Sequence, residues 1–288
     1  MTITMSTLTV DELRSTVRVL AVWQTGDRPA QLHPGDIGWF WRFGARRTAE
    51  AVRTWSRAGE VLAVGLLDGP DVLRLEIAPK AARDGELARQ VAEDAAAPER
   101  GVLPEGAAYV AAPPGALVRD LLGRHGWEDG DAWTPLRRDL GEPVPDPGVH
   151  IEVVGPEQAP ERTAVQRSAF ARPTFTDERW HTMAAASPYA AARCLLARDD
   201  RGNPVAAVTV WSAGAGRPGL IEPMGVHADH RGHGYGRAIV LGAARALREL
   251  GSSSVVVDTP SSLTAAVATY ESAGLRRLPE VKDLRREA

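Results

Sequence analysis

The chain has 288 residues, 44% of them hydrophobic, and a formal net charge of -3. This length exceeds the usual size of one domain and predicts two, and the near-neutral charge argues against nonspecific nucleic-acid binding. Cys194 is the only cysteine, which excludes an intrachain disulfide and a cysteine-based zinc site.

Nothing in the sequence indicates a membrane or export signal. No uninterrupted apolar run approaches the roughly 18 residues of a membrane span, and segment 1–17 lacks the basic and apolar regions of a signal peptide. We therefore expect a cytoplasmic protein whose partner is a small molecule and that binds neither membrane nor nucleic acid.

The first half of the chain predicts alternating helices and strands. Segment 37–43 is dense in aromatic residues at strand spacing, which favours packing in a sheet. Periodicity elsewhere predicts helices over 10–22, 46–58, 86–96 and 115–124, and strands over 61–67, 72–77 and 107–112.

A proline-rich, acidic stretch, Gly141 to Gly148, has the composition of a spacer between domains. It predicts domains at 1–140 and 149–288. The second half predicts a strand over 150–154, helices over 156–170 and 176–186 with Thr176 as N-cap, a hairpin of 193–197 and 205–211, a strand ending at Val226, a helix from Arg237, and a strand over 253–258.

A glycine-rich loop joins the strand at Val226 to the helix at Arg237. Gly232, Gly234 and Gly236 occupy alternate positions, so the backbone can turn sharply and approach a ligand without a Cβ in the way. The loop opens a helix, where unpaired N–H groups favour an anion. The sequence therefore predicts a phosphate-binding loop.

Two familiar glycine motifs do not fit this loop. No G-x-x-x-x-G-K-[ST] string of a P-loop occurs in the chain. A dinucleotide fingerprint, G-x-G-x-x-G, would need a glycine where Arg237 stands if it began at Gly232, and one where Ile239 stands if it began at Gly234.

The remaining pattern is R-x-x-G-x-G from Arg231, approached by V-x-x-x-x-R from Val226. With Ala266, Tyr270 and Gly274 in an A-x-x-x-Y-x-x-x-G segment, it resembles the GNAT superfamily of acetyl-CoA-dependent N-acyltransferases. The resemblance runs from about Ile151 to Leu284. It implies an α/β (α+β) fold, a mixed twisted sheet flanked by helices, in which the strands before and after the loop splay apart.

The resemblance also implies a cofactor site and no metal. Acetyl-CoA would lie with its pantetheine arm along the backbone of the pre-loop strand and its pyrophosphate in the loop. Ala228 departs from the proline usual in the family, and Leu263 stands where many members carry asparagine. The expected cofactor-binding residues are Val226, His227, Ala228, Arg231, Gly232, His233, Gly234, Tyr235, Gly236 and Arg237.

Attack by an amine on a thioester needs a base for the amine and an acid for the departing thiolate. Tyr270 occupies the family's acid position. Glu222, on the pre-loop strand and on the same face as Val226, is the expected base, directly or through water; His227 and His230 are the alternatives.

The first half repeats the element order of the second. Gly126 matches Gly274 at an offset of 148, but the counterpart of the loop, 82–87, keeps one glycine and gains two acids, and Leu122 stands opposite Tyr270. We therefore expect two tandem GNAT-like domains, the first without a working site. Its contribution would be structural support and a wall of the amine pocket, through Trp39 or Trp41.

The predicted activity is acetyl transfer to a primary amine of a small molecule, by direct attack in a ternary complex. The alternative is a noncatalytic acyl-CoA-sensing or interaction module, which would need the loop but neither Tyr270 nor Glu222. The amine and the oligomeric state stay open.

Overall fold

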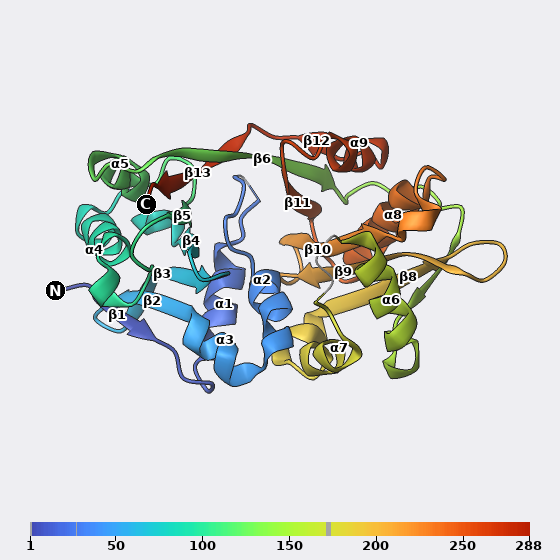
Figure 1. Ribbon diagram of the computed structural model, residues 1–288, viewed down its shortest axis with the longest axis horizontal. Coiled ribbons are helices and arrows are strands. Elements are labelled where there is room, and N and C mark those ends of the chain that lie inside the picture. The colour runs from blue at the N-terminus through green and yellow to red at the C-terminus, as the bar shows by residue number, and fades with distance from the viewer. Residues whose placement is uncertain (1, 27, 171–173) are drawn as a thin grey trace. The chain divides into compact units, whose positions relative to one another are not determined.

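The computed structural model describes residues 2–26, 28–170 and 174–288, which form two compact units (Figure 1). Unit 1 comprises Met1–His33, Ala45–Trp133 and Glu280–Ala288, and unit 2 comprises Pro34–Gly44 and Thr134–Pro279. Each unit contains a mixed sheet flanked by helices, so the predicted fold class is confirmed.

In unit 1 the first four strands pair antiparallel in chain order, β4 and β5 pair parallel, and the last strand of the chain, β13, pairs with both β5 and β6. The strands are β1 (Thr4–Thr7), β2 (Val52–Arg57), β3 (Glu60–Leu67), β4 (Val72–Ile77), β5 (Ala108–Ala111), the first half of β6 (Glu128–Asp139) and β13 (Val281–Arg286). The helices are α1 (Leu13–Trp23), α3 (Ala45–Ala51), α4 (Gly85–Ala96) and α5 (Leu117–Arg124), with 3-10 turns η2 (Pro79–Ala81) and η3 (Pro98–Arg100).

In unit 2 the strand order is β7, β8, β9, β10, β11 and the second half of β6, to which β12 adds. The strands are β7 (His150–Val153), β8 (Ala192–Arg198), β9 (Pro204–Ser212), β10 (Pro218–Val226), β11 (Ser254–Pro260) and β12 (Arg276–Arg277). The helices are α2 (Pro34–Phe40), α6 (Ala159–Ala169), α7 (Asp177–Ala184), α8 (Tyr235–Glu249) and α9 (Thr264–Ser272), with 3-10 turns η1 (Trp41–Phe43), η4 (Pro156–Gln158), η5 (Ser187–Ala191) and η6 (Ala228–His230).

Alternation along β9 builds a core on each face of the unit 2 sheet. Val208 and Val210 join the cluster under α8, whereas Ala207 and Trp211 join the cluster that contains residues of α6 and α7. This is the two-residue period of a strand that is buried on both faces. β9 thus holds the helix after the glycine loop on one side and the helices beside Glu222 on the other.

Helix α2 belongs to unit 2 because it packs against Trp211 of β9. A Cβ built at Gly35 would lie 2.5 Å from the Trp211 Cβ, and one at Gly38 would lie 2.4 Å from the indole carbon Cζ3. Two glycines three residues apart therefore let one side of the helix rest directly on the indole ring.

Two local predictions from the sequence were wrong, and one long strand was missed. Segment 37–43 forms the end of α2 and the turn η1, not a strand, because Gly38 follows Gly35 and the buried Phe40 follows Ile37 at the three-residue spacing of a helix face. The helix expected over 46–58 ends at Ala51, where β2 begins and pairs with both β1 and β3. The long strand β6 was not anticipated.

The compact units depart from the expected domain limits of 140 and 149 in three places. Helix α2 belongs to unit 2, β6 is divided between the units at Trp133 and Thr134, and β13 belongs to unit 1. β13 does so because its hydrogen-bonding partners are β5 and the first half of β6.

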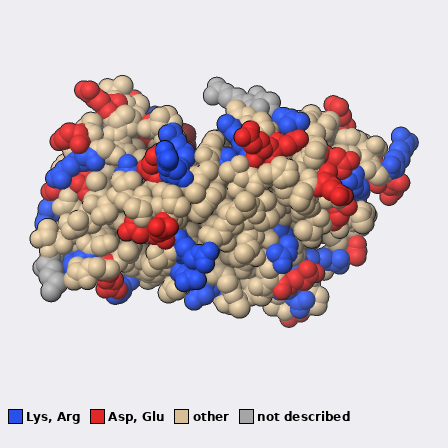
Figure 2. All heavy atoms as spheres, turned by 90° about the horizontal axis from the view of Figure 1, so that it is seen from below, with Lys and Arg blue, Asp and Glu red and all other residues tan. Residues whose placement is uncertain are grey.

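The surface carries both signs of charge. On the face drawn in Figure 2, basic and acidic side chains are interspersed, in keeping with the small net charge. None of the described helices is both long and apolar enough to cross a membrane.

Candidate active site

Strands β10 and β11 are paired over only three residues each. Parallel pairing joins Pro218–Leu220 to Ser254–Val256 and then stops, although β10 continues to Val226 and β11 to Pro260. A register shift in β10 between Ile221 and Met224 marks the point where its course changes. Beyond it β10 remains paired with β9 alone, so its other edge carries no strand partner among the described residues.

That edge presents the backbone of Val226. Successive residues of a strand direct their N–H and C=O groups to opposite edges, and the N–H of His227 donates to Val205 on the β9 side (2.9 Å). The N–H and C=O of Val226 therefore face the open edge. The N–H of Ala228 donates to the Ser168 hydroxyl (2.9 Å), so of the three backbone positions expected to bind pantetheine, Val226 is the best placed.

The glycine loop ends at the N-terminus of α8. Gly232 and Gly234 have φ angles of 79° and 83°, and a Cβ at either position would meet no protein atom within 4 Å. Both positions thus combine a left-handed backbone with open space. Gly236 differs, because its Cβ would lie 2.8 Å from Thr269 Cγ2 on α9, so this glycine serves the packing of the two helices.

The N–H groups of the loop point to an anion site. The first helical bond of α8 runs from Ala238 to Gly234 O (3.0 Å), so the N–H groups of residues 235–237 have no acceptor within the helix. Within the described part of the chain, the N–H groups of residues 232–234 have no hydrogen-bond acceptor either. Such donors at the start of a 15-residue helix favour negative charge.

Cationic and aromatic side chains surround this loop. Arg231 donates to Ala169 O (2.8 Å) and Arg237 to Ser272 O (3.0 Å), and both remain exposed. His230 lies edge-on to both His227 and Tyr235, with ring centroids 5.4 and 6.3 Å apart. His233 stacks on Tyr235 at 6.1 Å.

Tyr270 and Glu222 are electrostatic neighbours although 48 residues separate them in the chain. Tyr270 lies on α9 and is 6% exposed; its burial, and then the negative charge of Glu222, raise the pKa of its hydroxyl. The hydroxyl therefore stays protonated at neutral pH, as an acid must before it acts. Glu222 lies within the irregular part of β10, and its backbone oxygen accepts a hydrogen bond from Trp211 Nε1 (2.7 Å).

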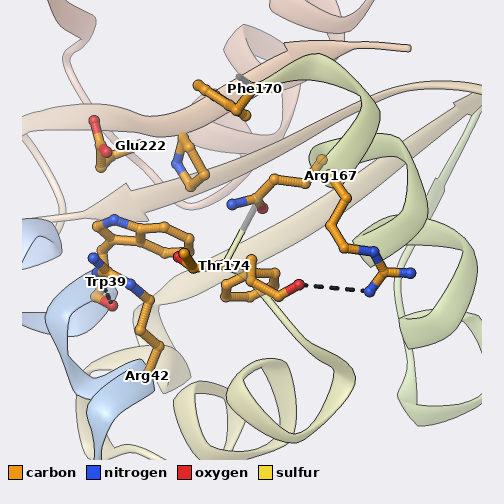
Figure 3. A pocket seen from close by; sticks show the side chains of 9 residues that line it. Trp39, Arg42, Arg167, Phe170, Thr174 and Glu222 are labelled. Carbon is orange, nitrogen blue, oxygen red and sulfur yellow. Dashed lines mark hydrogen bonds between the residues drawn. The ribbon is translucent and has the colours of Figure 1, made fainter. Parts of the chain in front are cut away.

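A pocket of about 230 Å³ opens beside Glu222 (Figure 3). Trp39 stacks on Phe175 with ring centroids 5.1 Å apart, and the Arg42 guanidinium lies 4.2 Å from the Trp39 ring. Trp39 was one of two wall residues expected from the sequence; Trp41 is not among the lining residues. The lining residues within the described part of the chain are Trp39, Arg42, Gln166, Arg167, Phe170, Thr174, Phe175, Glu222 and Pro223.

The sequence marked the loop, Tyr270 and Glu222 but not most of this pocket. Arg42, Gln166, Arg167 and Phe175 belong to no motif, and Arg42 lies more than 100 residues before the other three in the chain (166 - 42 = 124). The one available signal was the aromatic density of segment 37–43, which pointed to Trp39 and was assigned to a strand.

In segment 82–87 of unit 1, which the sequence predicted to be the counterpart of the glycine loop, an acidic side chain binds the N–H groups at the start of a helix. The Asp84 carboxylate accepts hydrogen bonds from the N–H groups of Glu86 (3.1 Å) and Leu87 (2.9 Å) at the start of α4. Arg57 pairs with it through two contacts of 2.7 and 2.9 Å, and these bonds, first of all those from Arg57, lower its pKa to about 2. The N–H groups that hold an anion at a helix start are here already occupied.

A sequence model described as the acetyltransferase (GNAT) family matches residues 161–275, which span β10, the glycine loop, α8, β11 and α9. This region of the chain is therefore similar to a GNAT acetyltransferase domain. Acetyltransferases of this family use acetyl-CoA in general. No curated protein sequence matches the chain significantly.

Solved structures share the fold over nearly the whole chain. A GCN5-related N-acetyltransferase from Sphaerobacter thermophilus is 21% identical, with a TM-score of 0.61 and coverage of 99% of this chain and 95% of that one. A tandem GNAT protein from the clavulanic acid biosynthesis pathway is 17% identical (TM-score 0.60; 99% and 98%). A GNAT-family acetyltransferase from Colwellia psychrerythraea is 12% identical (0.62; 99% and 98%).

Proposed function

We propose that this acetyltransferase moves an acetyl group from acetyl-CoA to a primary amine of a small molecule, by direct attack in a ternary complex. The observation that carries the proposal is the meeting of three features in unit 2. The open edge of β10 leads to the N-terminus of α8. Glu222 lines the pocket where the pocket adjoins β10, and Tyr270 is an electrostatic neighbour of Glu222.

The residues present fit acetyl-CoA. The unpaired N–H groups of the loop, together with Arg231 and Arg237, suit its pyrophosphate, and the Val226 backbone suits the amides of its pantetheine arm. Gly232 and Gly234 leave the space that a Cβ would take. When bound, acetyl-CoA supplies the acetyl group as a thioester, which an amine can attack.

Glu222 and Tyr270 take the two proton-transfer roles. Glu222 accepts a proton from the attacking amine, directly or through one water, and Tyr270 gives its proton to the departing sulfur. An amine and a thioester thereby become an amide and a thiol. The raised pKa of Tyr270 keeps its proton available until sulfur charge develops.

Glu222 is favoured over the two histidines as the base. It borders the pocket and acts electrostatically on Tyr270. His227 and His230 contact each other at the loop, and the His227 ring nitrogen Nδ1 accepts the N–H of Asp229 (3.3 Å). Their positions suit holding the cofactor.

We also infer that the chain is a tandem of two GNAT-like halves with a single cofactor site. The two halves share one order of elements: a strand, two or more helices, three strands, a 3-10 turn, a helix, a strand and a helix. The turns η2 and η6 are 149 residues apart (228 - 79 = 149). Asp84 supports the loss of a site in the first half, since its carboxylate occupies the position of a phosphate.

The test is acetyl transfer itself. The intact chain is incubated with acetyl-CoA and a panel of amino acids, amino sugars, polyamines and short peptides, and mass spectrometry detects an added acetyl group. A stable acetylated amine formed only with the enzyme is expected. Acetyl-CoA binding without transfer to any amine would favour the noncatalytic alternative.

A further inference from the structure

Positive charge dominates the walls of the pocket next to Glu222. Among the described lining residues Arg42 and Arg167 are cationic and Glu222 alone is anionic. The Arg42 guanidinium is fixed by a hydrogen bond to Trp39 O (2.8 Å) and by the rings of Trp39 and Phe43, at 4.2 and 4.3 Å. Figure 3 shows Arg42 and Glu222 on the Trp39 side of the pocket.

A third arginine lies directly behind this wall. Arg162 is 1% exposed, and it donates to Cys194 Sγ (3.1 Å), Thr209 Oγ1 (3.0 Å) and the Gln166 side chain. Its guanidinium also lies 4.7 Å from the Phe175 ring. Gln166 and Phe175 both line the pocket, so Arg162 is separated from it by one layer of side chains.

Among the described residues, no acidic side chain forms an ion pair with Arg162. Its hydrogen-bond partners are neutral, and none of the ion pairs formed by the described residues includes it. A buried charge is costly unless an opposite charge or strong hydrogen bonds compensate it. Arg167 differs, since it lies 3.9 Å from Asp177 and donates to Phe175 O (3.5 Å). Arg162 therefore adds a buried positive charge directly behind the wall that contains Arg42, and this charge would attract an anionic ligand group to that side of the pocket.

We propose that the acceptor is a small primary amine that also carries a carboxylate, with the amine at Glu222 and the carboxylate at Arg42. The inference rests on the proposed function and narrows its substrate class. Polyamines and amino sugars with several amines would bring like charges to the two arginines and are disfavoured. A volume of about 230 Å³ suits a molecule of amino-acid size, and the stacked Trp39 and Phe175 suit a flat apolar side chain.

Matched pairs of amines test the carboxylate. Each amino acid is compared with its decarboxylated amine, phenylalanine with 2-phenylethylamine and tryptophan with tryptamine, beside spermidine. kcat/KM is measured by thiol release and expressed per concentration of unprotonated amine. We expect at least one amino acid with a free α-carboxylate to exceed its partner and spermidine by tenfold or more.

Arg42→Gln then identifies the residue responsible. It should lower kcat/KM for the preferred amino acid about tenfold, mainly through KM, and leave the decarboxylated partner within twofold. Arg201→Gln removes an equal charge from an exposed turn of the same unit and should change neither. Unaltered acetyl-CoA affinity shows that the fold of the variant is intact.

The outcomes separate the inference from the proposed function. Equal or better use of the decarboxylated amines or spermidine overturns the inference while acetyl transfer stands. An equal loss for both members of a pair in Arg42→Gln assigns Arg42 a structural role and also overturns it. Absence of transfer to every amine, with acetyl-CoA still bound, contradicts the proposed function and the inference with it.

Discussion

Replacing Gly234 with valine tests the anion site at the start of α8. Gly234 has a φ of 83°, where an L-residue costs roughly 1–2 kcal/mol and a β-branched one more. A side chain there meets no protein atom within 4 Å, so Gly234→Val adds backbone strain without a clash inside the protein. Its methyl groups would instead occupy the space through which an anion reaches the loop N–H groups.

The size of the effect follows from the contacts at stake. A hydrogen bond to a charged group contributes about 1.5–3 kcal/mol, so loss or lengthening of one N–H contact to pyrophosphate should raise the Kd for CoA at least tenfold, about 1.4 kcal/mol. Titration calorimetry with CoA on the intact chain measures this value. Circular dichroism checks that the fold is retained.

Gly202→Val is the matched control. Gly202 lies in the turn between β8 and β9, has the same φ of 83°, and also has no atom within 4 Å of a built Cβ. The two variants should therefore lose similar stability, while only Gly234→Val loses CoA affinity. If both bind CoA as tightly as the unaltered chain, the N–H groups of this loop do not hold the cofactor and the assignment fails.

Two further predictions concern chemistry and the first half. Tyr270→Phe should lower kcat about 10²-fold and change the Kd for acetyl-CoA by less than twofold. Tyr270 acts as an acid only while its hydroxyl is protonated, and its pKa is raised above 10.0. The kcat of the unaltered enzyme should therefore not decline through loss of this proton below pH 10. An undiminished rate when chemistry limits turnover would leave Tyr270 a packing role. Asp84→Ala should destabilise the chain by about 1 kcal/mol at neutral pH through loss of the α4 N-cap. Since the folded-state pKa of Asp84 is depressed, that contribution is present above its ordinary value of 3.8 and is lost as pH falls toward about 2, where denaturation should no longer distinguish the variant. Calorimetry should give one CoA per chain before and after this change; two equivalent sites would contradict the single-site assignment.

The proposed cofactor side of the site was indicated by the sequence because its residues are close together in the chain. The glycines, Arg231 and Arg237 lie within one turn and the helix it opens, so local backbone chemistry alone indicates an anion. The role of Gly236 could not be separated from those of Gly232 and Gly234, since only the packing of Thr269 against α8 distinguishes it. The role of Tyr270 was predicted from the spacing of a family motif. That spacing places the residue on a helix but does not indicate which side chains surround it.

The acceptor side could not be predicted, because its residues meet only through tertiary packing. Arg42 and Arg167 are 125 residues apart (167 - 42 = 125), and no local pattern connects them. Segment 37–43 misled because aromatic residues favour strands on average, whereas here Gly35 and Gly38 fit a helix to the Trp211 ring. Nothing in the sequence around Trp211 predicted that two glycines of a distant helix would pack against its ring.

Trp211 connects the two sides of the site. Its ring supports α2, the helix that supplies Trp39 and leads to Arg42, while its Nε1 donates to the backbone oxygen of Glu222. The side chain is 1% exposed and packed in the core, so neither contact can move without displacing the other. The proposed acceptor wall and the proposed base therefore both contact Trp211 or an element that packs on it. Proton transfer requires a suitable distance between the amine and the proposed base. The packing of Trp211 on β9 would help to set that distance.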